Sequence, residues 1–188
     1  MSVPGWLLGL VLPLCATQGV RGVPDPVAPA SLRGIVRPGS PNHALAAPAG
    51  FSPAPDLGTR PYPVPAATLL AAVEAVASGE PRTFALPARP GTPWRRDFVA
   101  RSAVFNFPDL VAVEILPGEA SSGLVLWSRS VYGRSDLGAN RRRVTAWLAA
   151  LDARLGHASP AAAMPGDAAP IHPGAEAPAL STGQRSSP

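Results

Sequence analysis

The uneven distribution of proline limits how much of this chain can fold. The sequence has 25 prolines and 18 glycines among 188 residues. From Val20 to Asp56 it is rich in Pro, Ala and Gly with little periodicity, which indicates an extended segment. From His157 to Pro188 it has many prolines and no aromatic residue, so it cannot bury enough apolar surface to offset its ordering entropy. We therefore predict an extended segment over 23–58, one domain over 59–156 and a disordered tail over 157–188.

The predicted domain contains a helix, a run of strands and a second helix. Leu69, Leu70, Val73 and Val76 recur at helical spacing, and Gly79 ends that run. A short strand at 82–86 is followed by three alternating stretches, RDFVARSAVFNF, LVAVEIL and GLVLWSRSVY. The last helix, from about Asp136 to Leu155, has an apolar stripe that includes Asn140. We expect an α+β fold: a small antiparallel sheet of three to four strands, with one helix before and one after the strand meander.

Two loop lengths predict how the three strands pair. If Asn106–Asp109 and Ala120–Gly123 are four-residue hairpin loops, Arg101 faces Glu114, and Glu114 faces Arg129. This row of charges would share its face of the sheet with several large apolar residues, namely Val99, Phe105, Leu110, Leu116, Trp127 and Val131. Such a face is too apolar for solvent, so we expect the extended segment, a partner or a hydrophobic ligand to cover it.

The opposite face of the same strands is expected to pack on the helices. Strand alternation assigns eight residues to it: Ala100, Ser102, Val104, Val111, Val113, Ile115, Leu126 and Ser128.

The N-terminal stretch WLLGLVLPLCA, Trp6–Ala16, indicates a location outside the cytoplasm. It has the length of a secretory apolar core, is followed by small residues, and is too short to span a bilayer comfortably. We predict that residues 1–22 form a signal peptide, cleaved after Gly19, or an uncleaved N-terminal anchor. The protein would then work in the cell envelope, in the periplasm or associated with a membrane. The single cysteine, Cys15, lies in this stretch, so the chain cannot form an internal disulfide or a Cys-based metal site.

Three further stretches carry a resemblance to a known family. SPNHALAAPAG, RSAVFNFPD and SRSVYGRSDLGANRRRV are similar to the uncharacterised bacterial family catalogued as domain of unknown function 1499, over about Pro38 to Leu155. The resemblance implies a small α+β domain, often in proteins with an export or membrane segment, and no established activity. At Arg134 the chain departs from the bulky residue that family members often have.

The stretch YGRSDLGANRRR contains the candidate site. Ser135 or Asp136 is expected to cap the last helix through its side-chain oxygen. Gly138 costs roughly 1 kcal/mol against alanine inside a helix, so we expect another segment to approach it closely. Asn140 lies in the apolar stripe and is costly there unless both its amide groups are bonded. A strand or the Pro41–Asn42 segment is the expected partner of this structural clasp.

The alternative interpretation of the same stretch is an anion site. The free N–H groups at the start of the last helix, together with Arg129, Arg134 and Arg141, would hold a phosphate, a carboxylate or a phospholipid headgroup.

Neither catalysis nor nucleic-acid binding is expected. The predicted domain has no histidine, no nucleophile elbow and no phosphate loop. Asp109 with Asp136 is a carboxylate pair that could serve a hydrolase, although closing a turn and starting a helix suit these residues better. The net charge of +4 is unclustered except at Arg141–Arg143, which is too short for a nucleic-acid footprint. We expect a non-catalytic binding or structural module without cofactor or metal, whose partner is an envelope protein or a hydrophobic or anionic ligand.

Overall fold

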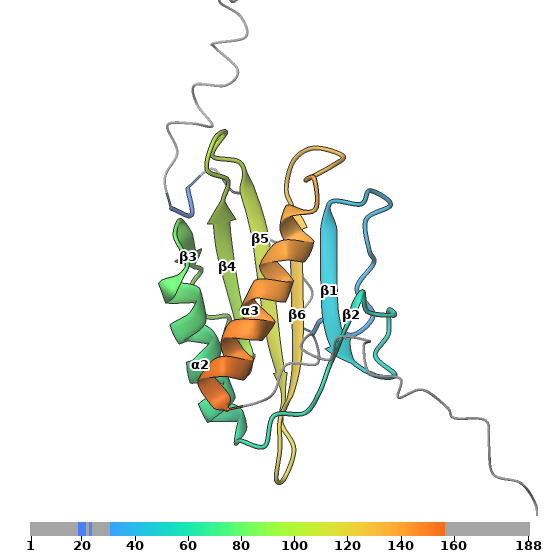
Figure 1. Ribbon diagram of the computed structural model, residues 1–188, viewed down its shortest axis with the longest axis vertical. Coiled ribbons are helices and arrows are strands. Elements are labelled where there is room, and N and C mark those ends of the chain that lie inside the picture. Colours follow the sequence, from blue (N-terminus) through green and yellow to red (C-terminus); the bar gives the residue numbers. More distant parts are fainter. Residues whose placement is uncertain (1–18, 22, 24–30, 157–188) are drawn as a thin grey trace, which may run out of the picture.

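The strands form one six-stranded sheet in the order β2-β1-β6-β5-β4-β3 (Figure 1). The structure is a computed structural model that describes residues 19–21, 23 and 31–156. The strands are β1 (His43–Pro48), β2 (Leu57–Thr59), β3 (Thr83–Ala85), β4 (Arg95–Arg101), β5 (Pro108–Leu116) and β6 (Gly123–Ser130). Neighbours are antiparallel except β1 and β2, which are parallel. The α+β class is confirmed, but the sheet has more than the expected three to four strands.

The two additional strands come from the segment that we expected to be an extended linker. β1 pairs with β6, with His43 opposite Arg129, and β2 continues the sheet beyond β1. The four central residues of β1 are all buried, so the strand has no alternation of polar and apolar residues to reveal it. The domain therefore begins before Thr59. The predicted tail over 157–188 lies outside the described residues, as does nearly all of the predicted signal peptide or anchor.

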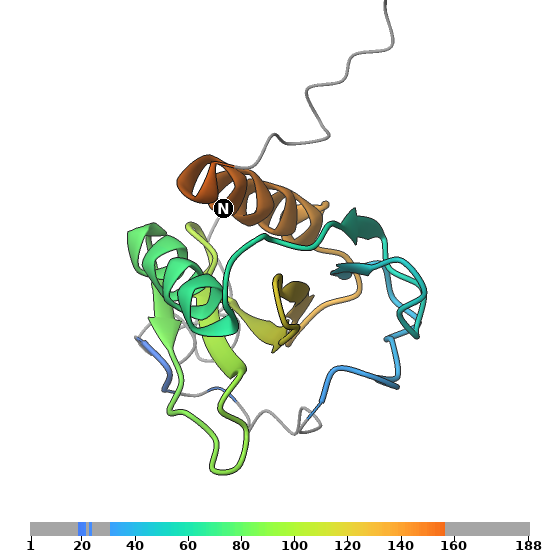
Figure 2. The same ribbon diagram turned by 90° about the horizontal axis from the view of Figure 1, so that it is seen from below.

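Two helices cover one face of the sheet, as Figure 2 shows. α2 (Ala66–Gly79) confirms the helix predicted from its leucine and valine spacing, and it ends at the expected glycine. α3 (Ala139–Leu155) buries Val144, Trp147 and Leu151 against the sheet. The Trp147 ring meets Phe98 of β4 edge to face, with centroids 5.6 Å apart. Among the described residues, no helix is both long and apolar enough to cross a membrane.

The predicted strand register is wrong, although the predicted faces are largely right. Arg101 pairs with Pro108, six residues before Glu114, and Glu114 pairs with Val125, four residues before Arg129. The predicted row Arg101–Glu114–Arg129 is therefore not formed. The connections are longer than expected, Ser102–Phe107 and Pro117–Ser122. Because both shifts are even, each side chain stays on its predicted face.

The helix-side prediction holds for the residues that remain in strands. Ala100, Val111, Val113, Ile115 and Leu126 join the core beneath the helices, and Ser128 bonds to α3. Ser102 and Val104, assigned to the same face, lie instead in the β4–β5 loop.

The other face of the sheet is covered by the chain's own N-terminal segment. This was one of the three covers predicted for it, the others being a partner and a hydrophobic ligand. Leu32, Ile35 and Phe51 pack on a set of sheet residues, namely Leu45, Ala47, Ala112, Val125 and Trp127. The segment is also held by polar bonds, because Ser31 Oγ and the Leu32 backbone N–H both donate to the Glu114 carboxylate. Residues before β1 and Phe51, between β1 and β2, thus cover this face. Phe105, expected on it, lies exposed in the β4–β5 loop.

Candidate functional site

Seven polar residues from distant parts of the chain meet where α3 begins. They are Asn42, Asp109, Ser128, Ser130, Asp136, Asn140 and Arg143, here called the Asn140 cluster. Asn140 and Ser128 are fully buried, and Asn42 and Asp109 nearly so. The cluster joins the segment before β1, the strands β5 and β6, the β6–α3 loop and α3 itself.

Asn140 bonds with both groups of its amide. Its Nδ2 has two hydrogens and three acceptors, the Asn42 carbonyl oxygen at 2.9 Å, Ser130 Oγ at 2.9 Å and an Asp136 carboxylate oxygen at 2.7 Å, so two of these acceptors share one N–H. Its Oδ1 accepts from Ser128 Oγ and, at 2.9 Å, from Arg143 Nη1. The bond to the Asn42 backbone is the one that the clasp interpretation requires. Because the buried amide already has hydrogen-bond partners for its oxygen and its nitrogen, its burial does not require a bond from a ligand.

Asp136 occupies the positive end of α3. Its carboxylate accepts the backbone N–H of Gly138 at 2.9 Å and of Asn140 at 2.7 Å. Asp136 therefore caps the first turn of α3, as predicted. Burial raises the pKa of Asp136, but the hydrogen bonds from Asn140 and Gly138 outweigh it and hold the pKa below its ordinary value. Ser135 lies further out and accepts only the Leu137 N–H, at 3.3 Å.

Gly138 has a different role from the one expected. The helix begins at Ala139, not near Asp136, and Gly138 precedes it with φ 79°, in the left-handed region. A side chain at this position would meet only the Arg142 Nη1 atom within 4 Å, so no other segment packs there. The glycine is required by the backbone turn, because other residues adopt this φ at a cost.

Arg143 connects Asn140 to β5. Its guanidinium donates to Asp109 Oδ2 at 2.8 Å and to Ser128 Oγ at 3.0 Å. Asp109 lies in β5 and does not close a turn, which corrects the role we expected for it. Both carboxylates of the Asp109–Asp136 pair considered for hydrolysis are therefore engaged within the cluster, one by a guanidinium and the other by N–H groups.

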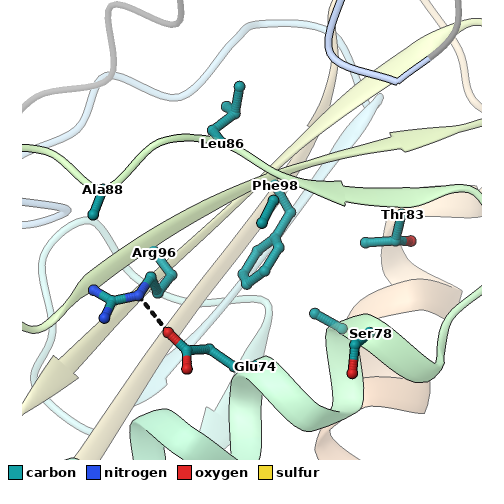
Figure 3. Close-up of a pocket in the computed structure, with 9 residues that line it drawn as sticks. Glu74, Ser78, Thr83, Leu86, Ala88, Arg96 and Phe98 are labelled. Carbon is teal, nitrogen blue, oxygen red and sulfur yellow. Dashed lines mark hydrogen bonds and ion pairs between the residues drawn. The ribbon is translucent and has the colours of Figure 1, made fainter.

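An open pocket of about 310 Å³ lies between α2 and the sheet edge at β3 and β4. Its lining is mostly apolar: Ala77, Ala85, Leu86, Ala88 and Phe98, with Glu74, Ser78, Thr83 and Arg96 around them. Figure 3 shows the Phe98 ring between an ion pair, Arg96 with Glu74, on one side and Ser78 and Thr83 on the other. Arg96 also donates to the carbonyls of Pro93 and Arg95, which fixes its guanidinium beside the pocket.

The residues of the Asn140 cluster lie in the stretches that carry the family resemblance. The segment before β1 supplies Asn42, the start of β5 supplies Asp109, the end of β6 supplies Ser128 and Ser130, and the last motif supplies Asp136 and Asn140. The model of the family described as "Protein of unknown function (DUF1499)" matches residues 36–151. The chain belongs to this family. No curated protein and no solved structure matches this chain.

The DUF1499 fold does not assemble the predicted three-arginine anion site. Arg129 points to the face of the sheet opposite α3, where its guanidinium lies 5.2 Å from the Trp127 ring centroid. Burial lowers the pKa of Arg129. Arg134 and Arg141 are exposed on the α3 side of the sheet end. Strand alternation turns Arg129 away from α3, because Ser128 and Ser130, on either side of it, face Asn140, whereas Arg134 lies in the β6–α3 loop and Arg141 in α3.

The residues of the predicted charged row likewise serve different parts of the DUF1499 domain. Arg101 donates to the backbone carbonyls of Gly19, Arg21 and Asn106. Glu114 accepts from Ser31 and Leu32. Among the residues that the structure describes, no group of three His, Cys, Asp or Glu side chains is placed to hold a metal ion.

Sequence reasoning missed three members of the cluster. Ser128 and Ser130 flank Arg129, so their shared face was visible from strand alternation alone. Arg143 follows Asn140 by three residues, which places the two on one side of a helix. Its partner Asp109 is 34 residues away, and no local pattern points to that pairing.

Proposed function

We propose that the chain is a non-catalytic binding module of the cell envelope, and that its pocket between α2 and β3 takes a small amphiphile. The observation that carries this proposal is the pocket itself. Its volume of about 310 Å³ falls within the range of small-molecule sites, and it is open while the faces of the sheet are filled.

The lining favours a ligand with an apolar body and an anionic end. The Phe98 ring and the alanine and leucine side chains offer a surface for hydrocarbon or ring atoms. The guanidinium of Arg96 can form a bidentate pair with a carboxylate or phosphate of the ligand. The ligand would then displace the half-exposed Glu74 from Arg96.

Three other parts of the domain are already filled or bonded. The helix-side core is packed, the opposite face is covered by the N-terminal segment, and the polar groups of the Asn140 cluster bond to one another. A chemically reacting substrate would have to displace Arg143 from Asp109 or the N–H groups from Asp136.

The pocket is tested with 1-anilinonaphthalene-8-sulfonate, an amphiphile with an anionic end, and its displacement by decanoate. Ala85→Phe fills the pocket and should abolish the dye fluorescence, and Arg96→Gln should weaken decanoate binding about tenfold, the value of one charge-assisted hydrogen bond. Ala149→Phe, at an exposed position of α3, is the matched control and should bind as the wild type does. Unchanged fluorescence in Ala85→Phe would contradict the proposal.

Envelope location is supported by the apolar stretch Trp6–Ala16 and the small residues after it. Cell fractionation should find the protein in the periplasmic or membrane fraction. Recovery from the cytosol with Met1 intact and no membrane association would refute this part of the proposal.

A further inference from the structure

The exposed large hydrophobic side chains of the domain gather at one end. Of the eight that are exposed among the described residues, seven lie on elements at this end: Val20, Phe84, Val104, Phe105, Phe107, Tyr132 and Leu137. Figure 1 places the β4–β5 loop, the β6–α3 loop and residues 19–21 at the upper end of the sheet, with residues 19–21 on the β3 side. Scattered single apolar residues are normal on a surface, but such clustering marks an interaction site.

The β4–β5 loop holds its apolar tip in a defined conformation. The Ser102 N–H donates to the Phe107 carbonyl, and the Phe107 N–H donates to Ser102 Oγ, both at 2.9 Å. Asn106 has φ 56°, the rings of Phe105 and Phe107 stack with centroids 5.6 Å apart, and Val104 is 79% exposed. The loop therefore presents valine and phenylalanine without the entropy loss of ordering a flexible segment on binding.

Four arginine side chains are exposed at the same end of the domain. Arg82, Arg134, Arg141 and Arg142 are exposed on elements of the same end, and none of the ion pairs within the described part of the chain involves them. Of the carboxylates at this end, Asp109 and Asp136 are bonded inside the Asn140 cluster, which leaves Glu80 at the end of α2. The surface is thus apolar at its tip and positive around it, which complements an anionic surface.

The chain also enters the domain at this end. The Arg101 guanidinium donates to the carbonyls of Gly19, at 2.8 Å, and of Arg21. Eighteen residues precede Gly19, and they include the apolar stretch Trp6–Ala16. The apolar stretch therefore joins the domain at the end that carries the exposed apolar and arginine side chains. A bilayer is a partner that both the stretch and this surface could bind.

We propose that this end of the domain docks on an anionic phospholipid bilayer. Val104 and Phe105 enter the boundary between headgroups and acyl chains, and Arg134 and Arg141 lie among the headgroup phosphates. The contact sets the orientation of the domain, with the β5–β6 loop at the far end pointing away from the bilayer. This inference is independent of the amphiphile pocket.

The test measures which end of the full chain touches the membrane. In a Cys15→Ser background, an environment-sensitive fluorophore is attached at Val104→Cys, or at Glu119→Cys in the exposed β5–β6 loop as the matched control. With vesicles of phosphatidylglycerol and phosphatidylethanolamine, the label at 104 should shift to the blue and be quenched by spin-labelled lipid, while the label at 119 should not respond. Phosphatidylcholine vesicles should give little shift, and Arg134→Gln with Arg141→Gln should weaken loop insertion roughly fivefold per arginine.

Three results would overturn the proposal. They are no shift at position 104, equal shifts at 104 and 119, or equal shifts on anionic and zwitterionic vesicles. Light scattering without vesicles adds a further check. A reversible dimer that Phe105→Ser abolishes would assign this end to a second copy of the chain and overturn the bilayer as its partner.

Discussion

Replacement of Asn140 by leucine lowers the free energy of unfolding by about 3 kcal/mol. The substitution removes the acceptor of the buried Ser128 hydroxyl and one of the two hydrogen bonds that the Asn42 carbonyl accepts, the other coming from the Ser130 N–H. It also removes the acceptor of one Arg143 N–H, and each buried donor left without its acceptor costs about 1–3 kcal/mol. It also removes a bond from Asp136, whose carboxylate holds the start of α3. Urea unfolding followed by circular dichroism measures the loss.

Thr145→Leu is the matched control for this experiment. Thr145 is exposed on the same helix, so its replacement should change stability by no more than about 0.5 kcal/mol. An Asn140→Leu variant as stable as the control would show that the cluster does not act as a clasp. If inorganic phosphate stabilised the wild type but not Arg141→Ala, the start of α3 would be an anion-binding site after all.

Leu32→Ala loosens the segment that covers the sheet and lowers the free energy of unfolding by about 2–4 kcal/mol. Leu32 is fully buried in the core cluster that includes Leu45 and Trp127, and truncation of a buried leucine leaves a cavity of a size that costs this much. The same substitution weakens the hydrogen bond from the Leu32 N–H to the Glu114 carboxylate. Denaturant unfolding gives the stability.

Val36→Ala is the matched control, because Val36 belongs to the same segment and is 90% exposed. It should leave stability within about 0.5 kcal/mol of the wild type. If both variants unfold at the same denaturant concentration as the wild type, the segment is not part of the cooperative fold.

The arrangement of the Asn140 cluster explains why residues so far apart in the sequence define one motif. Each strand or loop that meets at the start of α3 contributes a group that bonds to another element, so the cluster ties β1, β5, β6 and α3 into one position. We propose that binding uses two surfaces that the cluster holds in place, the pocket beside α2 and the apolar end formed by the β4–β5 and β6–α3 loops.

Local patterns in the sequence determined part of this site. A buried amide in the middle of an apolar stripe has to be bonded, which predicted that Asn140 bonds to a neighbouring segment. A strand or the Pro41–Asn42 segment was the expected partner, and the structure shows a bond to the Asn42 carbonyl. The positive φ of Gly138 could not be anticipated in the same way. A glycine near a helix start is equally compatible with a close packing contact, and only the position of the first helical residue, Ala139, decides between the two.

The sequence by itself determined α2, the α+β class and the division of strand residues between two faces. These depend on the periodic burial of neighbouring side chains, which a short window of sequence records. Only the tertiary structure decided the strand register, the two extra strands and the covering segment. The Ser102–Phe107 loop is closed by its own backbone bonds and by Arg101, and the Pro117–Ser122 loop is held by the bridge between Tyr62 and Ser122. Such contacts join residues that no local period relates, so their positions follow from the packing of the whole chain.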